Sequence, residues 1–230
     1  KNDGIELTPE AYPDLFSWSQ AEDHNWQKEY FSNIAHTYNA ELSLSGGSSR
    51  FNYMLGGGFR RENTVYDKKN GLSIGNFRSN LDYNTADGKF TASLSASYAT
   101  DKNDIIPLSF NNFLTLPPNY SLYTADGELN WGLENPIAQL EQTIENKTKN
   151  MVSNFSLSYR LLPNLVTKIN TGYTRMHMDQ MALHPRRSFN PAYSTPGSNS
   201  FTDATTATFN FEPQLDYDLV LGRNAFHALL

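Results

Sequence analysis

The clearest period-two pattern of this chain lies at residues 90–98, which are FTASLSASY. Phe90, Leu94 and Tyr98 fall on one side together with two alanines, and only Ser and Thr fall on the other. Successive side chains of a β-strand point to opposite faces of its sheet, so the pattern predicts a strand with one apolar and one polar face. The preceding residues 85–88, TADG, predict a tight hairpin turn because Asp-Gly is favoured there.

The same alternation recurs in about seven further segments, so the sequence predicts about eight antiparallel strands. A slip in the alternation near Gly75 predicts a β-bulge. The predicted strands are about 9–13 residues long, which matches the ~9–11 residues that cross a bilayer better than the ~5–6 of globular strands. Their apolar positions include Tyr38, Leu42, Leu44, Phe51, Tyr53, Leu55, Phe59, Phe77, Leu81, Tyr83, Phe155, Leu157, Tyr159, Ile169, Tyr173, Phe209 and Phe211.

The connections between these strands alternate in length. Short turns on one rim and long loops on the other are typical of outer-membrane barrels, in which the short turns are periplasmic. The first part of the chain, residues 1–35, has no strand period and is predicted to be a loop or excursion, with a possible short helix at 20–28. The predicted short turns are 46–49, 85–88, 162–164 and 221–224, and the longer connections are 63–71, 102–149 and 177–203.

Composition excludes several classes of protein. No apolar run approaches the ~18 residues of a membrane-spanning helix, whereas a mean hydropathy of -0.57 is compatible with barrel strands, which alternate. A net charge of -6 without a basic cluster argues against a nucleic-acid partner. The five His residues lack zinc-motif spacing and no Ser lies in a Gly-x-Ser-x-Gly turn, so the sequence predicts no enzyme, metal site or cofactor. The loop acids Asp101, Asp104, Asp126 and Glu128 lack EF-hand spacing and are interpreted as solvated charges.

The long loop 102–149 is the main candidate for a binding surface. Loops beyond ~15 residues are usually functional or disordered, and this one is rich in aromatic and Asn side chains that suit sugar rings and hydroxyls. The alternative is that these side chains pack the loop against itself or a partner. Asn135 and Pro136 predict the start of a short helix. The candidate substrate- or lid-contacting residues are Phe110, Phe113, Tyr120, Tyr123, Trp131, Asn112 and Asn130.

Two stretches resemble SusC/RagA-type TonB-dependent transporters of Bacteroidetes. Residues 36–58, HTYNAELSLSGGSSRFNYMLGGG, resemble the family's strand ending in Ser-Gly-Gly and the glycine-rich strand after it. Residues 114–140, LTLPPNYSLYTADGELNWGLENPIAQL, resemble its first large extracellular loop. The resemblance implies an outer-membrane importer of oligosaccharides or peptides that works with a SusD-like lid lipoprotein. It also implies energy from TonB through an N-terminal plug, which this sequence does not contain, and a barrel of about 22 strands.

We therefore expect an all-β fold, an antiparallel transmembrane β-barrel segment at 36–230 that follows the excursion at 1–35. Two alternatives remain open. A soluble β-sandwich that binds glycans has the same alternation, with one wet and one core face. A bare structural barrel, such as an adhesin anchor, would need no lid partner. In a barrel Leu42 and Leu94 face lipid, whereas in a sandwich they contact a second sheet.

Overall fold

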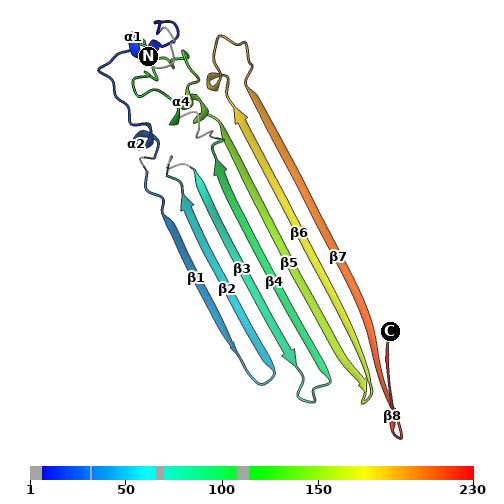
Figure 1. Ribbon diagram of the computed structural model, residues 1–230. Coiled ribbons are helices and arrows are strands. Elements are labelled where there is room, and N and C mark those ends of the chain that lie inside the picture. Colours follow the sequence, from blue (N-terminus) through cyan, green and yellow to red (C-terminus); the bar gives the residue numbers. More distant parts are fainter. Residues whose placement is uncertain (1–6, 32, 66–69, 108–113) are drawn as a thin grey trace.

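The computed structural model describes residues 7–31, 33–65, 70–107 and 114–230. Within these ranges, eight antiparallel strands form a single sheet in which each strand pairs with its neighbours in sequence (Figure 1). The all-β prediction and its eight strands are therefore confirmed. The strands are β1 (Thr37–Gly47), β2 (Phe51–Asn63), β3 (Gly71–Asn84), β4 (Phe90–Ile105), β5 (Thr143–Leu162), β6 (Leu165–His184), β7 (Ser198–Leu221) and β8 (Asn224–Leu229).

Short helices lie at the rim with the long connections (Figure 1). They are α1 (Pro13–Phe16), α2 (Trp26–Tyr30), α4 (Pro136–Gln139) and the 3-10 helix η1 (Arg186–Ser188). The predicted helix start is confirmed, because the side chain of Asn135 accepts a hydrogen bond of 3.0 Å from the Ile137 amide at the first turn of α4. Within the described ranges, no helix combines the length and the apolar character needed to cross a membrane.

The strands are longer than the alternation predicted. β5 and β6 have 20 residues each and β7 has 24. The β4–β5 connection therefore spans 106–142 instead of the predicted 102–149, and the β6–β7 connection spans 185–197 instead of 177–203. The predicted bounds were wrong because polar and charged side chains interrupt the apolar alternation at these strand ends while the backbone ladder continues.

The bulge predicted at Gly75 is also wrong. Gly75 pairs in register with Phe59 on one side and Thr100 on the other, without a shift. A glycine at an apolar-face position interrupts the alternation without adding a residue to the strand. The register shift among the described pairs lies between Arg160 and Leu162, at the turn between β5 and β6.

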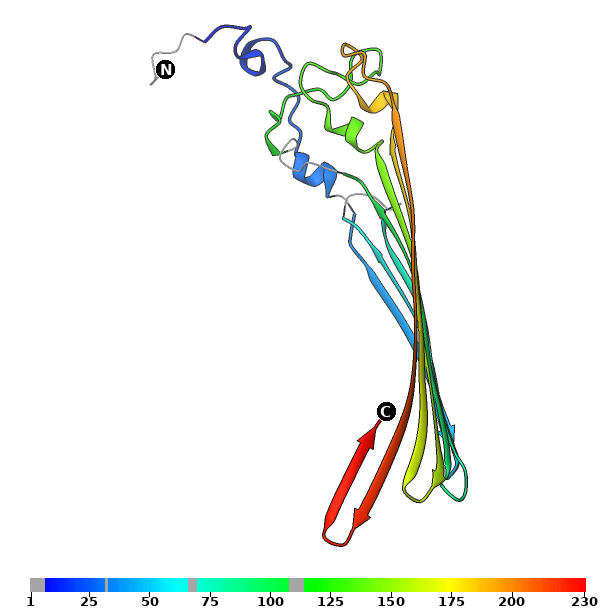
Figure 2. The same ribbon diagram turned by 90° about the vertical axis from the view of Figure 1, so that its right-hand side faces the viewer.

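The sheet is a single layer. Figure 2 shows it nearly edge-on, with the loops gathered at one end and the β7–β8 hairpin bending away at the other. Leu42 is 79% exposed and Leu44 57%, so in the described part of the chain neither packs against a second sheet. The two-sheet sandwich is therefore not the fold of these residues. Most of the fully buried apolar side chains lie among the loops rather than on the sheet.

Candidate functional site

One face of the sheet carries aligned apolar side chains. Paired residues of antiparallel strands point to the same face, so the register decides which side chains become neighbours. Phe77 pairs with Tyr98, which pairs with Met151, and Leu94 pairs with Phe155. These aligned side chains include exposed ones, such as Phe77 at 50% and Phe155 at 38%. A broad exposed apolar surface of this kind marks contact with lipid or with another protein.

The height of this surface matches a bilayer. We define the apolar band as the outward positions of residues 90–98 in β4, of their partners 151–159 in β5, and of residues 167–173 in β6, which pair with 153–159. Nine residues at a rise of about 3.3 Å extend about 30 Å, or about 23 Å along the membrane normal at a tilt of about 40°. Outer-membrane barrels have an apolar belt of about 25 Å. The band therefore has the height expected of a lipid-facing wall.

Aromatic rings border the band at the rim with the short turns. Phe51 pairs with Tyr83, and Phe90 pairs with Tyr159. The ring centroids of Tyr83 and Phe90 are 6.3 Å apart. Such rings are typical of the boundary between lipid tails and headgroups, where an amphipathic side chain is favoured.

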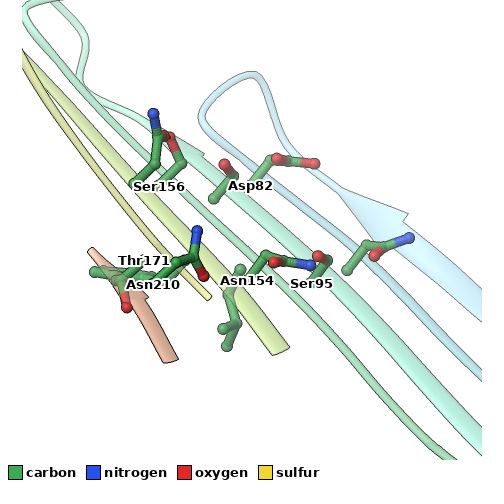
Figure 3. Close-up of a pocket in the computed structure, with 11 residues that line it drawn as sticks. Asp82, Ser95, Asn154, Ser156, Thr171 and Asn210 are labelled. Atoms are coloured by element: carbon green, nitrogen blue, oxygen red, sulfur yellow. The ribbon is translucent and has the colours of Figure 1, made fainter. Parts of the chain in front are cut away.

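The opposite face is polar and contains a hollow of about 370 Å³. Figure 3 shows labelled lining side chains from five neighbouring strands, β3 to β7. The Ser156 hydroxyl donates to Asn170 Oδ1 at 2.7 Å. Gly172 leaves room for the amides, because a Cβ there would collide with the Asn210 side chain. The hollow is lined by polar residues of this face, which are Asn80, Asp82, Ser93, Ser95, Asn154, Ser156, Asn170 and Asn210. It also borders Leu94, Phe155 and Thr171, whose side chains belong to the opposite face by the strand alternation.

The polar lining can bind water or a polar solute through amides and hydroxyls, which both donate and accept hydrogen bonds. The sequence-based candidates did not include it. Its members alternate with apolar residues in five strands, and only the register brings them together. The signal in the sequence that could have revealed this lining is the repetition of Asn and Ser at matching positions of neighbouring strands.

The loops at the other rim have a small aromatic core. Trp26, Tyr30, Leu116, Tyr120 and Leu122 form this loop core. The Trp26 indole donates a hydrogen bond of 3.1 Å to the backbone oxygen of Leu116. Burial raises the pKa of both Tyr30 and Tyr120, so these phenols stay neutral and act as packing groups. The loop core therefore joins the excursion before β1 to the long loop before β5.

The predicted loop candidates have different environments. Tyr120 is 1% exposed, and its hydroxyl donates to the Asn130 backbone oxygen at 2.9 Å, which favours the packing interpretation. Asn130 is half-buried and its side-chain amide donates to the Ser121 carbonyl at 2.8 Å. Tyr123 is 49% exposed and Trp131 is half-buried, so both side chains are accessible to a ligand or partner. The remaining candidates lie outside the described residues: Phe110, Asn112 and Phe113.

A cluster of possible metal ligands lies above the apolar band on the same face. The ligand atoms of His177, Asp179 and Asp203 lie within 4.8 Å of one another. His177 Nδ1 is 2.8 Å from the Thr205 hydroxyl and its Nε2 is 3.2 Å from Asp179. This group is not visible in the sequence, because Asp203 reaches it only through the β6–β7 pairing. The ring is already held by these neighbours, and the cluster is therefore explained as a cross-strand polar network.

Comparison with solved structures gives the same architecture. The chain matches a chain of the RagAB peptide importer in its closed-closed state, with 18% identity over 93% of this chain and a TM-score of 0.67. The chain has the fold of a segment of this importer. The open-open state of the RagAB importer matches with 16% identity, 99% coverage and a TM-score of 0.64. Neither a protein-family model nor a curated protein matches the sequence.

The RagAB match confirms the resemblance to SusC/RagA-type barrels at the level of fold. The present chain spans only 26% to 28% of the length of the RagAB chains that it matches. Within the described pairs, the eight strands do not close on themselves, and β1 and β8 each have one open edge. Open edges pair readily with further strands, which a barrel wall would supply.

Proposed function

We propose that this chain supplies part of the wall and the extracellular loops of a TonB-dependent outer-membrane importer. The observation that carries the proposal is the two-faced sheet. Its apolar band is exposed and about as high as a bilayer, whereas its other face carries the Asn- and Ser-rich hollow. A sheet with such faces is stable where lipid lies on one side and water on the other.

In this role the chain contributes surfaces rather than chemical catalysis. The polar face lines a water-filled passage, and its amides and hydroxyls replace part of the hydration of a passing solute. Energy for import comes from TonB acting on a plug that transporters of this type carry outside the present segment. The function is transport, with no cofactor.

The proposed substrates are oligosaccharides or peptides, with a SusD-like lipoprotein as the lid. The resemblance in sequence supports the SusC-type pairing, and the similarity to a peptide importer, RagAB, supports peptides as one substrate class. The loop core holds the extracellular loops in shape, and Tyr123 and Trp131 stand accessible beside it. We propose these two side chains, with Asn130, Phe110, Asn112 and Phe113, as contacts for substrate or lid.

The chain offers a matched topology test. The tetrapeptide Thr-Ala-Asp-Gly occurs twice, at 85–88 in the short β3–β4 turn and at 124–127 in the long loop, and Ala86 and Ala125 are both exposed. The sequence contains no Cys, so single cysteines can be introduced into the full-length protein without a native thiol in this segment. In intact cells, a membrane-impermeant maleimide should label Ala125→Cys and should label Ala86→Cys only after the outer membrane is permeabilised.

Equal labelling of both variants in intact cells, or recovery of the full-length protein in the soluble periplasm, would contradict the proposal. The lid is tested separately by co-purification in mild detergent. A SusD-like lipoprotein should accompany the wild-type protein, and its absence would favour the bare structural barrel. Uptake of labelled peptides and of labelled oligosaccharides is then compared between a deletion strain and the same strain complemented with the gene. The class of compound whose uptake is restored is the substrate class.

A further inference from the structure

A second hollow lies on the lipid-facing side of the sheet, where the apolar band ends. It has a volume of about 400 Å³ and is lined by Tyr98, Lys149, Met151, Arg175 and His177. These residues come from β4, β5 and β6. Tyr98 pairs with Met151 and Met151 with Arg175, while Lys149 pairs with His177 one step further from the band. The register therefore builds a compact patch that is apolar at Tyr98 and Met151 and cationic at Arg175, in the same row, and at Lys149, in the next row.

The two permanent cations of this patch have no carboxylate partner among the described residues. Lys149 and Arg175 are both exposed and occur in no ion pair there. By contrast, the neighbouring Lys102 and Lys147 both contact Glu145, with Lys102 Nζ 2.7 Å from its carboxylate. The positive charge at the hollow is therefore available to an external anion.

His177 closes the upper side of the hollow. Its ring is oriented by Thr205 and lies 3.2 Å from Asp179 and 3.7 Å from Asp203. These carboxylates lie on the far side of the ring from the band, so they limit how far the cationic surface extends. The aromatic row at the opposite edge of the band, Phe51, Tyr83, Phe90 and Tyr159, contains no cation.

We propose that this hollow binds the phosphorylated headgroup of an outer-leaflet lipid. The phosphate lies between Lys149 and Arg175, because a guanidinium and an ammonium both donate charge-assisted hydrogen bonds to phosphate oxygens. The lipid's acyl chain extends down over Tyr98 and Met151 along the apolar band. A lipid fits this hollow because the hollow continues into the apolar band. A free phosphate would leave the apolar part of the hollow without a contact.

The inference depends on the proposed membrane position of the sheet. Given that position, Lys149 and Arg175 stand at the height where lipid tails end and headgroups begin. Each basic residue near an anionic headgroup strengthens binding several-fold. Losing both Lys149 and Arg175 should therefore weaken lipid binding by roughly 10- to 30-fold.

The test uses the purified full-length protein and native mass spectrometry to count bound lipid A after detergent exchange. The double variant Lys149→Gln/Arg175→Gln should retain 10- to 30-fold less lipid A than the wild type. Lys147→Gln is the matched control, because it lies on the same strand face but is already paired with Glu145, and it should retain the wild-type amount. An excess of inorganic phosphate should displace little of the lipid.

Two results would overturn the inference. One is unchanged lipid retention in the double variant. The other is complete displacement by inorganic phosphate, which would make the hollow a general anion site. The cysteine labelling described above distinguishes this failure from failure of the proposed function. If labelling gives the expected topology and lipid retention does not change, only the lipid site is wrong.

Discussion

Replacing Leu94 with arginine tests which face of the sheet contacts lipid. Leu94 lies at the centre of the apolar band, four residues from Phe90 and four from Tyr98. At a rise of about 3.3 Å and a tilt of about 40°, it is about 10 Å from either edge of the band along the membrane normal. An arginine facing lipid at such a depth costs about 2–4 kcal/mol, whereas one near the edge costs about 0–1 kcal/mol.

The next residue is the matched control. Ser95 points to the opposite face and lines the polar hollow, where the side chain has room and water. We expect Ser95→Arg to change the free energy of unfolding by no more than about 0.5 kcal/mol, as is usual for a solvated position. Tyr98→Arg, at the band's edge, should fall between the two. Leu94→Ala separates the cost of losing the leucine from the cost of placing a charge in lipid.

The measurement is equilibrium unfolding of the full-length protein in lipid vesicles, followed by tryptophan fluorescence across a urea series. The expected order of destabilisation is Leu94→Arg, then Tyr98→Arg, then Ser95→Arg. If Ser95→Arg costs as much as Leu94→Arg, the polar face is packed rather than wet. If Leu94→Arg is neutral, the apolar band does not contact lipid, and the wall assignment is refuted.

Two further substitutions test the loops and the strand ends. Tyr120→Phe removes a hydroxyl that links backbone groups of its own loop, so it should cost about 1–3 kcal/mol of local stability and speed proteolysis there, whereas Tyr123→Phe should not. Gly71→Ala should destabilise the barrel by about 1–3 kcal/mol in the same urea assay, because Gly71 has φ 151° and a Cβ would collide with the Glu62 backbone oxygen. Gly75→Ala, where the nearest contact would be an ordinary 3.6 Å, should be neutral or slightly stabilising.

The sheet was largely predictable because it needs only a local signal. Alternation with period two determines which residues share a face, and turn residues determine where strands reverse. The turn predicted at 85–88 is confirmed, and within it Gly88 takes the left-handed conformation with φ 62°. The same signal failed at the upper ends of β4 and β5. There Lys102 and Glu145 stabilise the strand by an ion pair across the ladder, and a charged pair leaves no apolar period to detect.

The candidate sites were less predictable because they depend on contacts between distant parts of the chain. Tyr120 and Tyr123 are three positions apart, yet one is 1% exposed and the other 49%. Their difference arises from the loop core, in which Trp26 contacts the backbone of Leu116, 90 positions away. A sequence pattern shows that a loop is rich in aromatic residues, but the excursion before β1 decides which of them are buried.

Wall and loops are stabilised by different interactions, and this difference fits their proposed roles. Continuous ladders hold the wall, in which β6 pairs with both β5 and β7 over most of its length. The loops at the other rim depend instead on a few aromatic contacts and on backbone hydrogen bonds from side chains such as Asn135, whose amide donates to the Leu122 carbonyl at 2.7 Å. Segments with few buried apolar contacts open at lower free energy than a sheet ladder. In the proposed function, a lid or substrate that binds at the accessible loop side chains would therefore reorganise the loops while the sheet keeps its register.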